Sequence, residues 1–118
     1  MSDGEYNSLI AELQVDYLAS FPAKITTLKS HFSDQDWQGL ELEFHKLKGT
    51  GTTYGIPEIS DICREMERIC RDTPDKISGV FSVCVDLIQD VEKSYKNQKE
   101  KFALETDKRY SLLCQQGA

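Results

Sequence analysis

The sequence predicts an all-α protein, an antiparallel four-helix bundle with an additional N-terminal helix and a long C-terminal helix. Apolar residues recur at the three- and four-residue spacing of amphipathic helices along most of the chain. Strand signals are missing, since no sustained alternation occurs and no Asn-Gly or Asp-Gly pair joins two alternating runs. The 118 residues, 39% of them hydrophobic, suit a single domain with a core of its own. Short connections between the helices favour an antiparallel bundle.

The first predicted helix spans residues 3–20, and Ser2 with Glu5 three residues later resembles a capping box at its start. Ser20-Phe21-Pro22 predicts a kink or a restart, because proline fits the first turn of a helix but not its interior. A second helix follows to about Phe32. The expected core stripes of these two helices are Tyr6, Leu9, Ile10, Leu13 and Tyr17, and then Phe21, Ile25 and Leu28.

Two further helices and the start of a third complete the predicted bundle. One spans residues 34–54 and ends before the Gly-Ile-Pro of residues 55–57. The next spans residues 58–71 and carries a dense apolar pattern. The last begins near Asp75, after Thr73-Pro74 as N-cap and first helical residue.

The apolar stripe of the last helix is regular as far as Tyr95. Beyond that point it thins to Gln98, Phe102, Arg109 and Leu113. We therefore expect a bundle core over about residues 5–95 and a C-terminal helical extension over residues 96–118, partly disordered, that outruns the bundle. The whole chain, residues 1–118, forms one domain in this interpretation.

Composition excludes several classes of function. The net charge is −6 and no segment is strongly basic, which makes nucleic acid a poor partner. No apolar run approaches the roughly 20 residues of a membrane span. The acidic N-terminus has no signal-peptide pattern, so we expect a cytoplasmic protein with reduced thiols. Because the chain begins with Met1 and holds little besides the bundle, we expect a free-standing protein.

A metal site is not expected. The four cysteines have no C-x-x-C spacing and only two histidines are present. We interpret the cysteines as small buried hydrophobic residues. They are Cys63, Cys70, Cys84 and Cys114.

The helix predicted over residues 34–54 carries the informative residues. On a helical wheel one apolar arc holds Leu40, Phe44, Leu47, Gly51 and Tyr54. His45 falls outside that arc, toward water, so it is either a solvated histidine without a role or a reactive one. Its ring would be flanked by Gln38, Glu41, Leu42, Lys48, Gly49 and Thr52.

Two neighbours of His45 favour the reactive interpretation. Gly49 lies one turn away, and a mid-helix glycine costs about 1 kcal/mol relative to alanine, so it needs a reason. Without a Cβ it leaves room for a bulky group beside the imidazole. Lys48, three residues from His45, brings an ammonium to the same place. An imidazole, an open space and a cation together suit a phosphoryl group.

The stretch of residues 49–53, Gly-Thr-Gly-Thr-Thr, is poor helix material. A loop is therefore the alternative to a helix here. The apolar register that continues from Leu47 to Tyr54 favours the helix. Gly51 lies on the core arc, where it would allow a neighbouring helix to approach closely.

Residues 45–55, His-Lys-Leu-Lys-Gly-Thr-Gly-Thr-Thr-Tyr-Gly, resemble the H-x-L-K-G-(S/A/T)-x-x-x-(apolar)-G signature of histidine phosphotransfer (HPt) domains. Residues 56–67 are similar to the family's following helix, with an apolar run, Cys63 and an acidic Glu67. The resemblance covers residues 5 to about 95. Thr50 and Gly51 depart from the commoner Ser or Ala, which indicates a softer helix and leaves the chemistry intact.

The resemblance implies a role for each matched residue. His45 would be the phosphorylated residue, Lys48 would stabilise the phosphoryl oxygens, and Gly49 would give the partner access. Glu67 falls where relatives place a Gln or Glu that orients the imidazole. The alternative for Glu67 is a solvated surface charge.

The implied function is that of a phosphorelay intermediate in a two-component system. It would accept a phosphoryl group on His45 from a receiver-domain aspartate and pass it to another receiver aspartate. Imidazole, with an ordinary pKa of about 6.5, is a competent nucleophile near neutral pH. The chain has no G-x-x-x-x-G-K-(S/T) loop, so we expect neither ATP binding nor autophosphorylation.

The resemblance also implies the partners and cofactors. The partners are response-regulator receiver domains, of a hybrid sensor kinase and of a downstream regulator. We expect no cofactor on this chain, Mg²⁺ on the partner receiver, and a monomer. Ala11, Val15 and Leu18 lie roughly opposite the core arc of the first helix, and with Leu42 they could form a small docking patch. The full set of candidate docking residues is Ala11, Val15, Leu18, Gln38, Glu41, Leu42 and Thr52.

Two other function classes stay open at this stage. The chain could be a non-phosphorylated helical adaptor that binds and inhibits a kinase or a receiver. It could also be a dimerisation module whose long C-terminal helix pairs in trans. His31 lies at the predicted end of the second helix. We interpret it as an ordinary histidine at a helix C-terminus, where it interacts favourably with the helix dipole.

Overall fold

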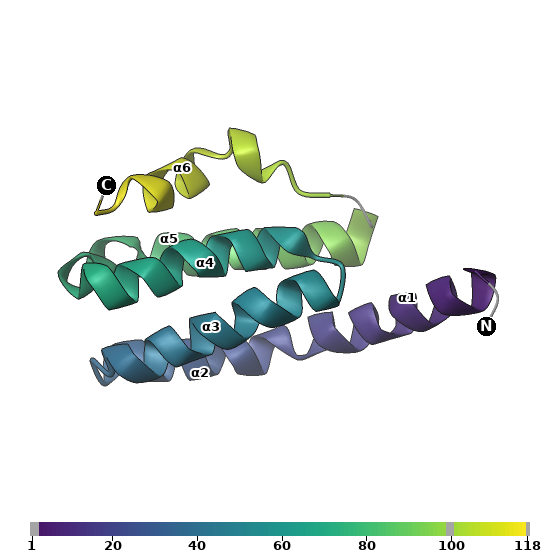
Figure 1. Ribbon diagram of the computed structural model, residues 1–118, viewed down its shortest axis with the longest axis horizontal. Coiled ribbons are helices and arrows are strands. Elements are labelled where there is room, and N and C mark those ends of the chain that lie inside the picture. The colour runs from purple at the N-terminus through teal and green to yellow at the C-terminus, as the bar shows by residue number, and fades with distance from the viewer. Residues whose placement is uncertain (1–2, 99–100, 118) are drawn as a thin grey trace.

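The computed structural model describes residues 3–98 and 101–117, and these residues form helices and no strand (Figure 1). This confirms the predicted all-α class. Ser2, the first residue of the predicted capping box, lies outside the described residues. The side chain of Tyr6, at the start of the first predicted apolar stripe, is not described either. The helices are α1 (Asp3–Ala19), α2 (Phe21–Ser33), α3 (Trp37–Thr53), α4 (Pro57–Asp72), α5 (Ile77–Lys93) and α6 (Lys108–Gln115), with short turns η1 (Pro74–Lys76), η2 (Ser94–Gln98) and η3 (Leu104–Thr106).

Helices α2 to α5 form the four-helix bundle, and consecutive helices run in opposite directions (Figure 1). The rings of Phe32 on α2 and Phe81 on α5 stack at 4.2 Å and join the first helix of the bundle to the last. The core contains fully buried side chains from all four helices, among them Phe21, Leu28, Leu40, Phe44, Ile62, Met66, Leu87 and Ile88. Cys63, Cys70 and Cys84 are buried and free, as predicted, whereas Cys114 is only partly buried.

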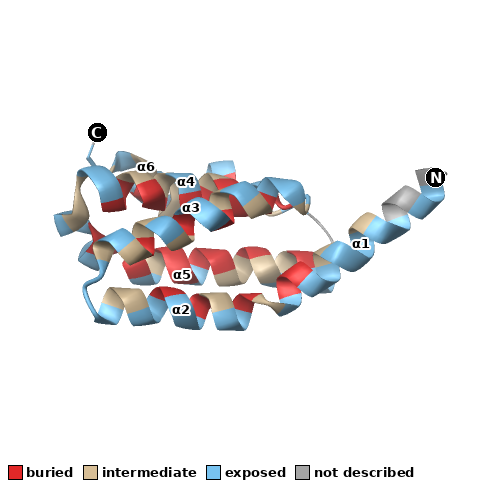
Figure 2. Cartoon of the chain, turned by 60° about the horizontal axis from the view of Figure 1, so that its bottom comes forward, coloured by how far each residue is buried: buried red, intermediate tan, exposed pale blue. Residues whose placement is uncertain are grey.

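Helix α1 leads into α2 at Ser20, which keeps a helical conformation and is followed by Pro22 in the first turn of α2. The N-terminal part of α1 projects past the end of the bundle (Figure 2). Leu9 and Leu13 are therefore 41% and 38% exposed, and their predicted place in the core is wrong. Among the described residues, no other helix covers the projecting part of α1 (Figure 2). Tyr17 is buried, as predicted.

Helix α3 begins later than predicted, at Trp37, because Asp36 is its N-cap and its carboxylate accepts the N–H of Gly39 at 3.0 Å. The helix continues to Thr53, so the helical interpretation of residues 49–53 is confirmed. Gly55 then adopts a φ of 77°, a conformation that favours glycine, and the chain reverses into α4.

The segment after Tyr95 differs from the predicted helical extension. The helix ends in the π-helical turn η2, and residues 101–117 run back beside α4 and α5 (Figure 1). Leu104 and Leu113 are 4% and 0% exposed, so this segment completes the core. Burial of these side chains explains the reversal, because a helix continuing past the bundle would leave them in water.

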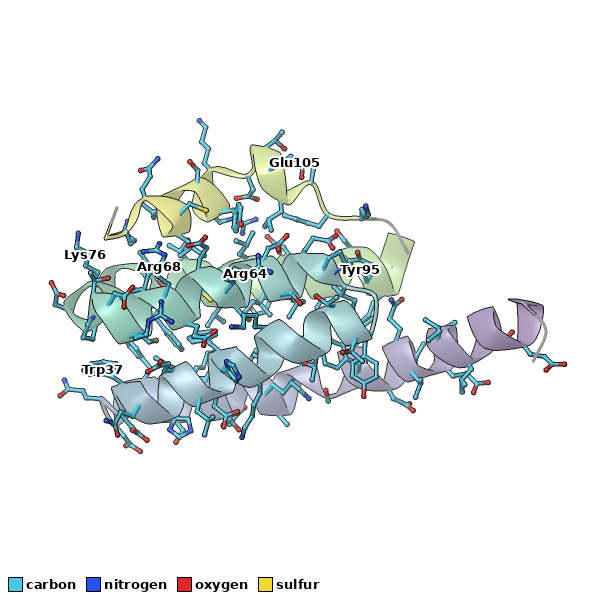
Figure 3. The ribbon with its side chains drawn as sticks, in the orientation of Figure 1. Trp37, Arg64, Arg68, Lys76, Tyr95 and Glu105 are labelled. Carbon is cyan, nitrogen blue, oxygen red and sulfur yellow. The ribbon has the colours of Figure 1, made fainter. Side chains whose placement is uncertain are left out.

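Two polar anchors fasten the returning segment to α4. The buried carboxylate of Glu58 accepts the hydroxyl of Tyr95 at 2.8 Å and the backbone N–H of Phe102 at 2.9 Å. At the other end, Arg68 donates to the backbone carbonyls of Leu113 and Gln116 (Figure 3). The described residues thus contain no long free C-terminal helix, and this part of the prediction is wrong.

Candidate functional site

His45 lies on the outer side of the seam between α3 and α4, and 59% of its side chain is exposed. Its Nδ1 is 2.9 Å from Oε1 of Glu67 on α4. Glu67 itself is only 8% exposed, so its interpretation as a solvated surface charge is wrong. The imidazole therefore faces water with one nitrogen held by a buried carboxylate.

Lys48 binds the same carboxylate. Its Nζ lies 2.7 Å from Oε2 of Glu67, so each carboxylate oxygen has its own partner. Burial raises the pKa of the Glu67 carboxyl, but hydrogen bonds from Lys48 and His45 and the charges of these residues outweigh burial and lower it overall. Glu67 is consequently ionised at neutral pH.

The charge state of Glu67 determines which imidazole nitrogen is available. An ionised carboxylate is an acceptor only, so the hydrogen of a neutral His45 ring lies on Nδ1 and is donated to Glu67. The lone pair is then on Nε2, the nitrogen that does not bond to Glu67. The site can therefore present a nucleophilic nitrogen without a neighbouring general base.

The two glycines of this stretch have different surroundings. A Cβ built on Gly49 has nothing within 4 Å, so open space borders the turn after His45. A Cβ on Gly51 would lie 2.6 Å from Oγ and 2.7 Å from the backbone N of Ser60. Gly49 thus has the surroundings expected of an access position, and Gly51 allows the close approach of α4, as predicted.

The other predicted flanking residues lie on α3 around the imidazole. Gln38 and Thr52 are exposed, Glu41 is partly exposed, and Leu42 is 53% exposed. The hydroxyl of Thr52 donates to Ser60 Oγ at 2.8 Å, so it is engaged with α4. Leu42 provides an apolar surface near the imidazole on the same helix.

The predicted docking residues of α1 lie elsewhere. Ala11, Val15 and Leu18 line one groove of about 320 Å³ together with Tyr95 and Lys96 of η2. Val15 is 65% exposed, but Leu18 is only 4% exposed and belongs to the core, so the expectation that it faces solvent is wrong. Leu18 is buried because this turn of α1 already packs against the bundle. The structure thus unites His45, Lys48 and Glu67, whereas the α1 residues line a groove that includes none of these three.

Two polar residues near the site were missed in the sequence. Arg71 lies one turn after Glu67 on α4, and its guanidinium pairs with Asp72 at 2.9 Å. Ser60 is 1% exposed and donates to the backbone carbonyl of Lys48 at 2.6 Å. Arg71 follows Glu67 by four residues and Ser60 precedes it by seven. Both spacings keep a residue close to the same helix face as Glu67, and this was the signal in the sequence that could have found them.

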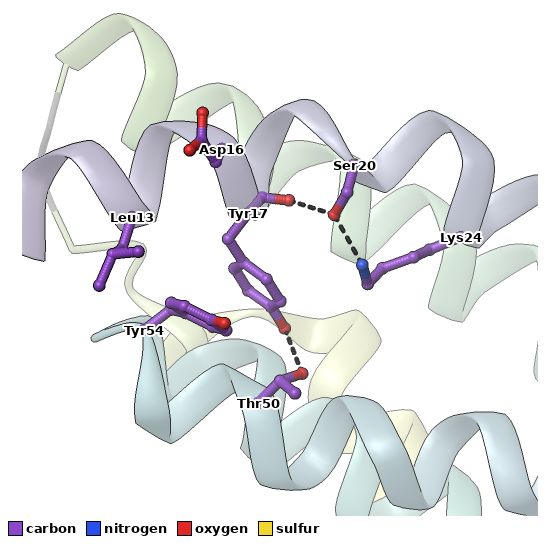
Figure 4. Close-up of a pocket in the computed structure, with 7 residues that line it drawn as sticks. All are labelled: Leu13, Asp16, Tyr17, Ser20, Lys24, Thr50 and Tyr54. Atoms are coloured by element: carbon purple, nitrogen blue, oxygen red, sulfur yellow. Dashed lines mark hydrogen bonds between the residues drawn. The ribbon is translucent and has the colours of Figure 1, made fainter.

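A second hollow lies where α1 meets α3. Its volume is about 280 Å³, and the hydroxyls of Tyr17 and Thr50 are 2.8 Å apart in its wall (Figure 4). Burial, the largest cause, raises the pKa of Tyr17 to about 12. Lys24 donates to Ser20 in the same hollow. These contacts fix the α1–α2 junction against the helix that carries His45.

His31 provides an internal comparison. It lies in the last turn of α2, as predicted, and its Nδ1 is 3.0 Å from Oδ2 of Asp36. Only 28% of its side chain is exposed, against 59% for His45. His31 is therefore part of the α2–α3 junction, and His45 is the more accessible of the two histidines.

Two general features complete the description of the site. Among residues 3–98 and 101–117, no three His, Cys, Asp or Glu side chains are grouped as a metal site. No helix in the described part of the chain is long and apolar enough to cross a membrane.

An exposed histidine with a lysine and an open glycine on one helix, in an all-α bundle, agrees with the comparison with known families. The family model described as "Hpt domain" matches residues 12–98, which is most of the chain. No curated protein and no solved structure matched the chain. The chain belongs to the Hpt domain family. Hpt domains carry out histidine phosphotransfer in the phosphorelays of two-component systems and interact with receiver domains.

Proposed function

We propose that this protein is a phosphorelay intermediate whose phosphorylated atom is Nε2 of His45. It accepts the phosphoryl group from the aspartyl phosphate of one receiver domain and passes it to the aspartate of another. The observation that carries this proposal is the hydrogen bond between His45 Nδ1 and the ionised Glu67, because it leaves the Nε2 lone pair free on an exposed ring.

The proposed step is an in-line displacement at phosphorus. A bond forms between Nε2 and phosphorus while the bond between phosphorus and the aspartyl oxygen breaks, and the receiver carboxylate leaves with the electron pair. The hydrogen on Nδ1 stays in its bond to Glu67, which supports the positive charge that develops on the imidazole. The reverse displacement passes the phosphoryl group to the next aspartate.

The residues around His45 supply positioning and charge. We propose that Lys48 turns from Glu67 to the phosphoryl oxygens once they arrive, since it lies three residues from His45 and binds the same carboxylate as the imidazole. The open space at Gly49 admits the partner's active site. We expect this chain to need no cofactor of its own, and we expect the partner receiver to bring Mg²⁺.

Further parts of the proposal concern the cellular setting. We propose a cytoplasmic monomer that is itself a phosphoprotein during the relay. Its partners would be the receiver domain of a hybrid sensor kinase and that of a downstream regulator. The α3 surface formed by Gln38, Glu41, Leu42 and Thr52 would contact them, and the exposed Val15 would add a contact on α1.

The test is phosphotransfer from a panel of radiolabelled phospho-receivers. The acceptors are the unmodified chain, His45→Gln and His31→Gln. We expect acid-labile, base-stable label on the unmodified chain and on His31→Gln, and none on His45→Gln. Circular dichroism and receiver binding establish that His45→Gln remains folded and competent to dock.

A different result would change the function assigned. Binding of a receiver or a kinase with no label on any variant would support the alternative of a non-phosphorylated adaptor that binds and inhibits its partner. Label that persists on His45→Gln would mean that another residue accepts the phosphoryl group.

A further inference from the structure

Helices α3 and α4 are in close contact at Gly51, two residues before the end of α3. The backbone N and Oγ of Ser60 would lie 2.7 and 2.6 Å from a Cβ at this position, and the backbone O of Ile56 would lie 3.1 Å from it. No side chain other than hydrogen fits there without displacing α4. The two helices are thus in backbone contact at the end of the hairpin that they form.

A chain of two hydroxyl groups crosses this contact. Thr52 Oγ1 on α3 donates to Ser60 Oγ on α4 at 2.8 Å, and Ser60 Oγ donates to the backbone carbonyl of Lys48 on α3 at 2.6 Å. The single hydroxyl hydrogen of Ser60 is thereby committed to Lys48. Ser60 is 1% exposed, so water does not compete for its bonds. We call Thr52 and Ser60 the hydroxyl bridge.

The hydroxyl bridge and the His45–Glu67 hydrogen bond belong to the same helix seam. Seven residues separate His45 from Thr52 on α3, and seven separate Ser60 from Glu67 on α4. Seven residues are close to two helical turns, about 10 Å along the axis, so the members of each helix share a face. In the antiparallel hairpin, the register and the separation of α3 and α4 therefore determine both the Thr52–Ser60 contact and the His45–Glu67 contact.

We propose that the hydroxyl bridge is the device that positions His45 against Glu67. Thr52 and Ser60 fix the sliding and rotation of α4 along α3, and this places the carboxylate of Glu67 at hydrogen-bond distance from Nδ1. Both are positioning residues, since neither contacts the imidazole. The effect of this positioning on phosphotransfer rests on the proposed function, but the placement of Glu67 against His45 does not.

The central variant is Ser60→Ala, which removes both bonds across the seam. It leaves no buried polar group without a partner, because the Thr52 hydroxyl reaches water and the Lys48 carbonyl keeps its place in the helix. Thr53→Ala is the matched control. Its hydroxyl bonds to Gly49 within α3 at 3.1 Å, so its loss changes the same helix turn without touching α4. Thr52→Ser retains the bridging hydroxyl, so the hydrogen bond between His45 and Glu67 should be unchanged in it.

The primary measurement is the ¹⁵N NMR spectrum of the two histidine rings in the unphosphorylated protein, with His31 as internal reference. We expect Ser60→Ala to shift the His45 ring from the Nδ1–H form toward Nε2–H, with no change at His31, while Thr53→Ala and Thr52→Ser leave both rings unchanged. Transfer from a phospho-receiver should slow about fivefold in Ser60→Ala and stay unchanged in Thr53→Ala, with receiver affinity retained.

The two proposals fail in different ways. His45 ring signals that are the same in Ser60→Ala and in the unmodified chain would overturn the hydroxyl-bridge proposal, even if transfer slowed. A folded, unmodified chain that accepts no phosphoryl group would overturn the proposed function, and the NMR comparison would still decide whether the bridge positions His45.

Discussion

The ammonium of Lys48 lies 2.7 Å from one oxygen of the Glu67 carboxylate, while the other oxygen lies 2.9 Å from His45 Nδ1. A single buried anion therefore holds both groups that the proposed chemistry needs. In the unphosphorylated state Lys48 is paired, and an arriving phosphoryl group, with its higher charge, competes with Glu67 for the ammonium.

The importance of this competition can be measured with Lys48→Ala. Removing the ammonium should slow phosphotransfer about tenfold, because a charged hydrogen bond to the phosphoryl oxygens is lost in the transition state. Lys46→Ala is the control, since Lys46 lies on the same helix but pairs with Glu43. Equal transfer rates for the two variants, measured by rapid quench with one phospho-receiver, would rule out a special role for Lys48.

Gly49→Ala should raise the stability of the protein and lower its rate of phosphotransfer. The new Cβ meets open space, so the helix should gain about 0.5–1 kcal/mol in free energy of unfolding, while phosphotransfer falls because the space beside His45 is reduced. Gly79→Ala on α5 is the matched control, because a Cβ there also has nothing within 4 Å. It should give the same rise in urea stability with unchanged transfer. A Gly49→Ala chain that transfers at the original rate would mean that the glycine is not needed for access.

Substitution by aspartate should have different effects at the two apolar residues Val15 and Leu18. Leu18→Asp puts a charge into the core and should cost several kcal/mol of stability, about 2–5 by comparison with other core changes. Val15→Asp changes an exposed residue and should leave the melting temperature nearly unchanged while it slows transfer. Thermal unfolding and transfer rates of both variants test this. Normal transfer by Val15→Asp would remove the α1 surface from the docking proposal.

Removal of residues 101–118 should destabilise the bundle. Leu104 and Leu113 contribute about 1.5–3 kcal/mol each through burial, and the truncated chain also leaves the carboxylate of Glu58 without the Phe102 N–H. A clear fall in the melting temperature is therefore expected, with the apparent mass still that of a monomer. An unchanged melting temperature would show that the returning segment adds nothing to the core.

Acid should weaken the seam between α3 and α4 through Glu67. Its pKa in the folded protein is lowered from 4.5, so its contribution is fully present above that pH and is lost as the pH falls through the lowered value. Below about pH 4.5 the unmodified chain should lose stability more steeply than Glu67→Gln, whose amide does not titrate. Denaturation series at several pH values measure how the free energy of unfolding of each chain depends on pH. The same dependence in both chains would contradict the assignment of this acid sensitivity to Glu67.

The fold class and the candidate phosphoryl acceptor follow from local patterns. Helix period, prolines and glycines placed α2, α3 and α4 within a few residues, because these signals act over one or two turns. The signature around His45 made it the candidate acceptor, and its register outside the apolar arc correctly predicted that its side chain reaches water. Gly51 was correctly assigned to helix contact for the same reason.

What only the tertiary structure decided concerns residues far apart in the sequence. Apolar spacing in α1 does not say whether another helix lies opposite, so Leu9 and Leu13 were misassigned and Leu18 was expected in solvent. The pairing of His45 with Glu67 and the Ser60 bridge depend on the register of two antiparallel helices, and the burial of Leu113 depends on a chain reversal. A helix period gives the direction of a side chain around its own axis, whereas its partner is determined by how separate helices pack.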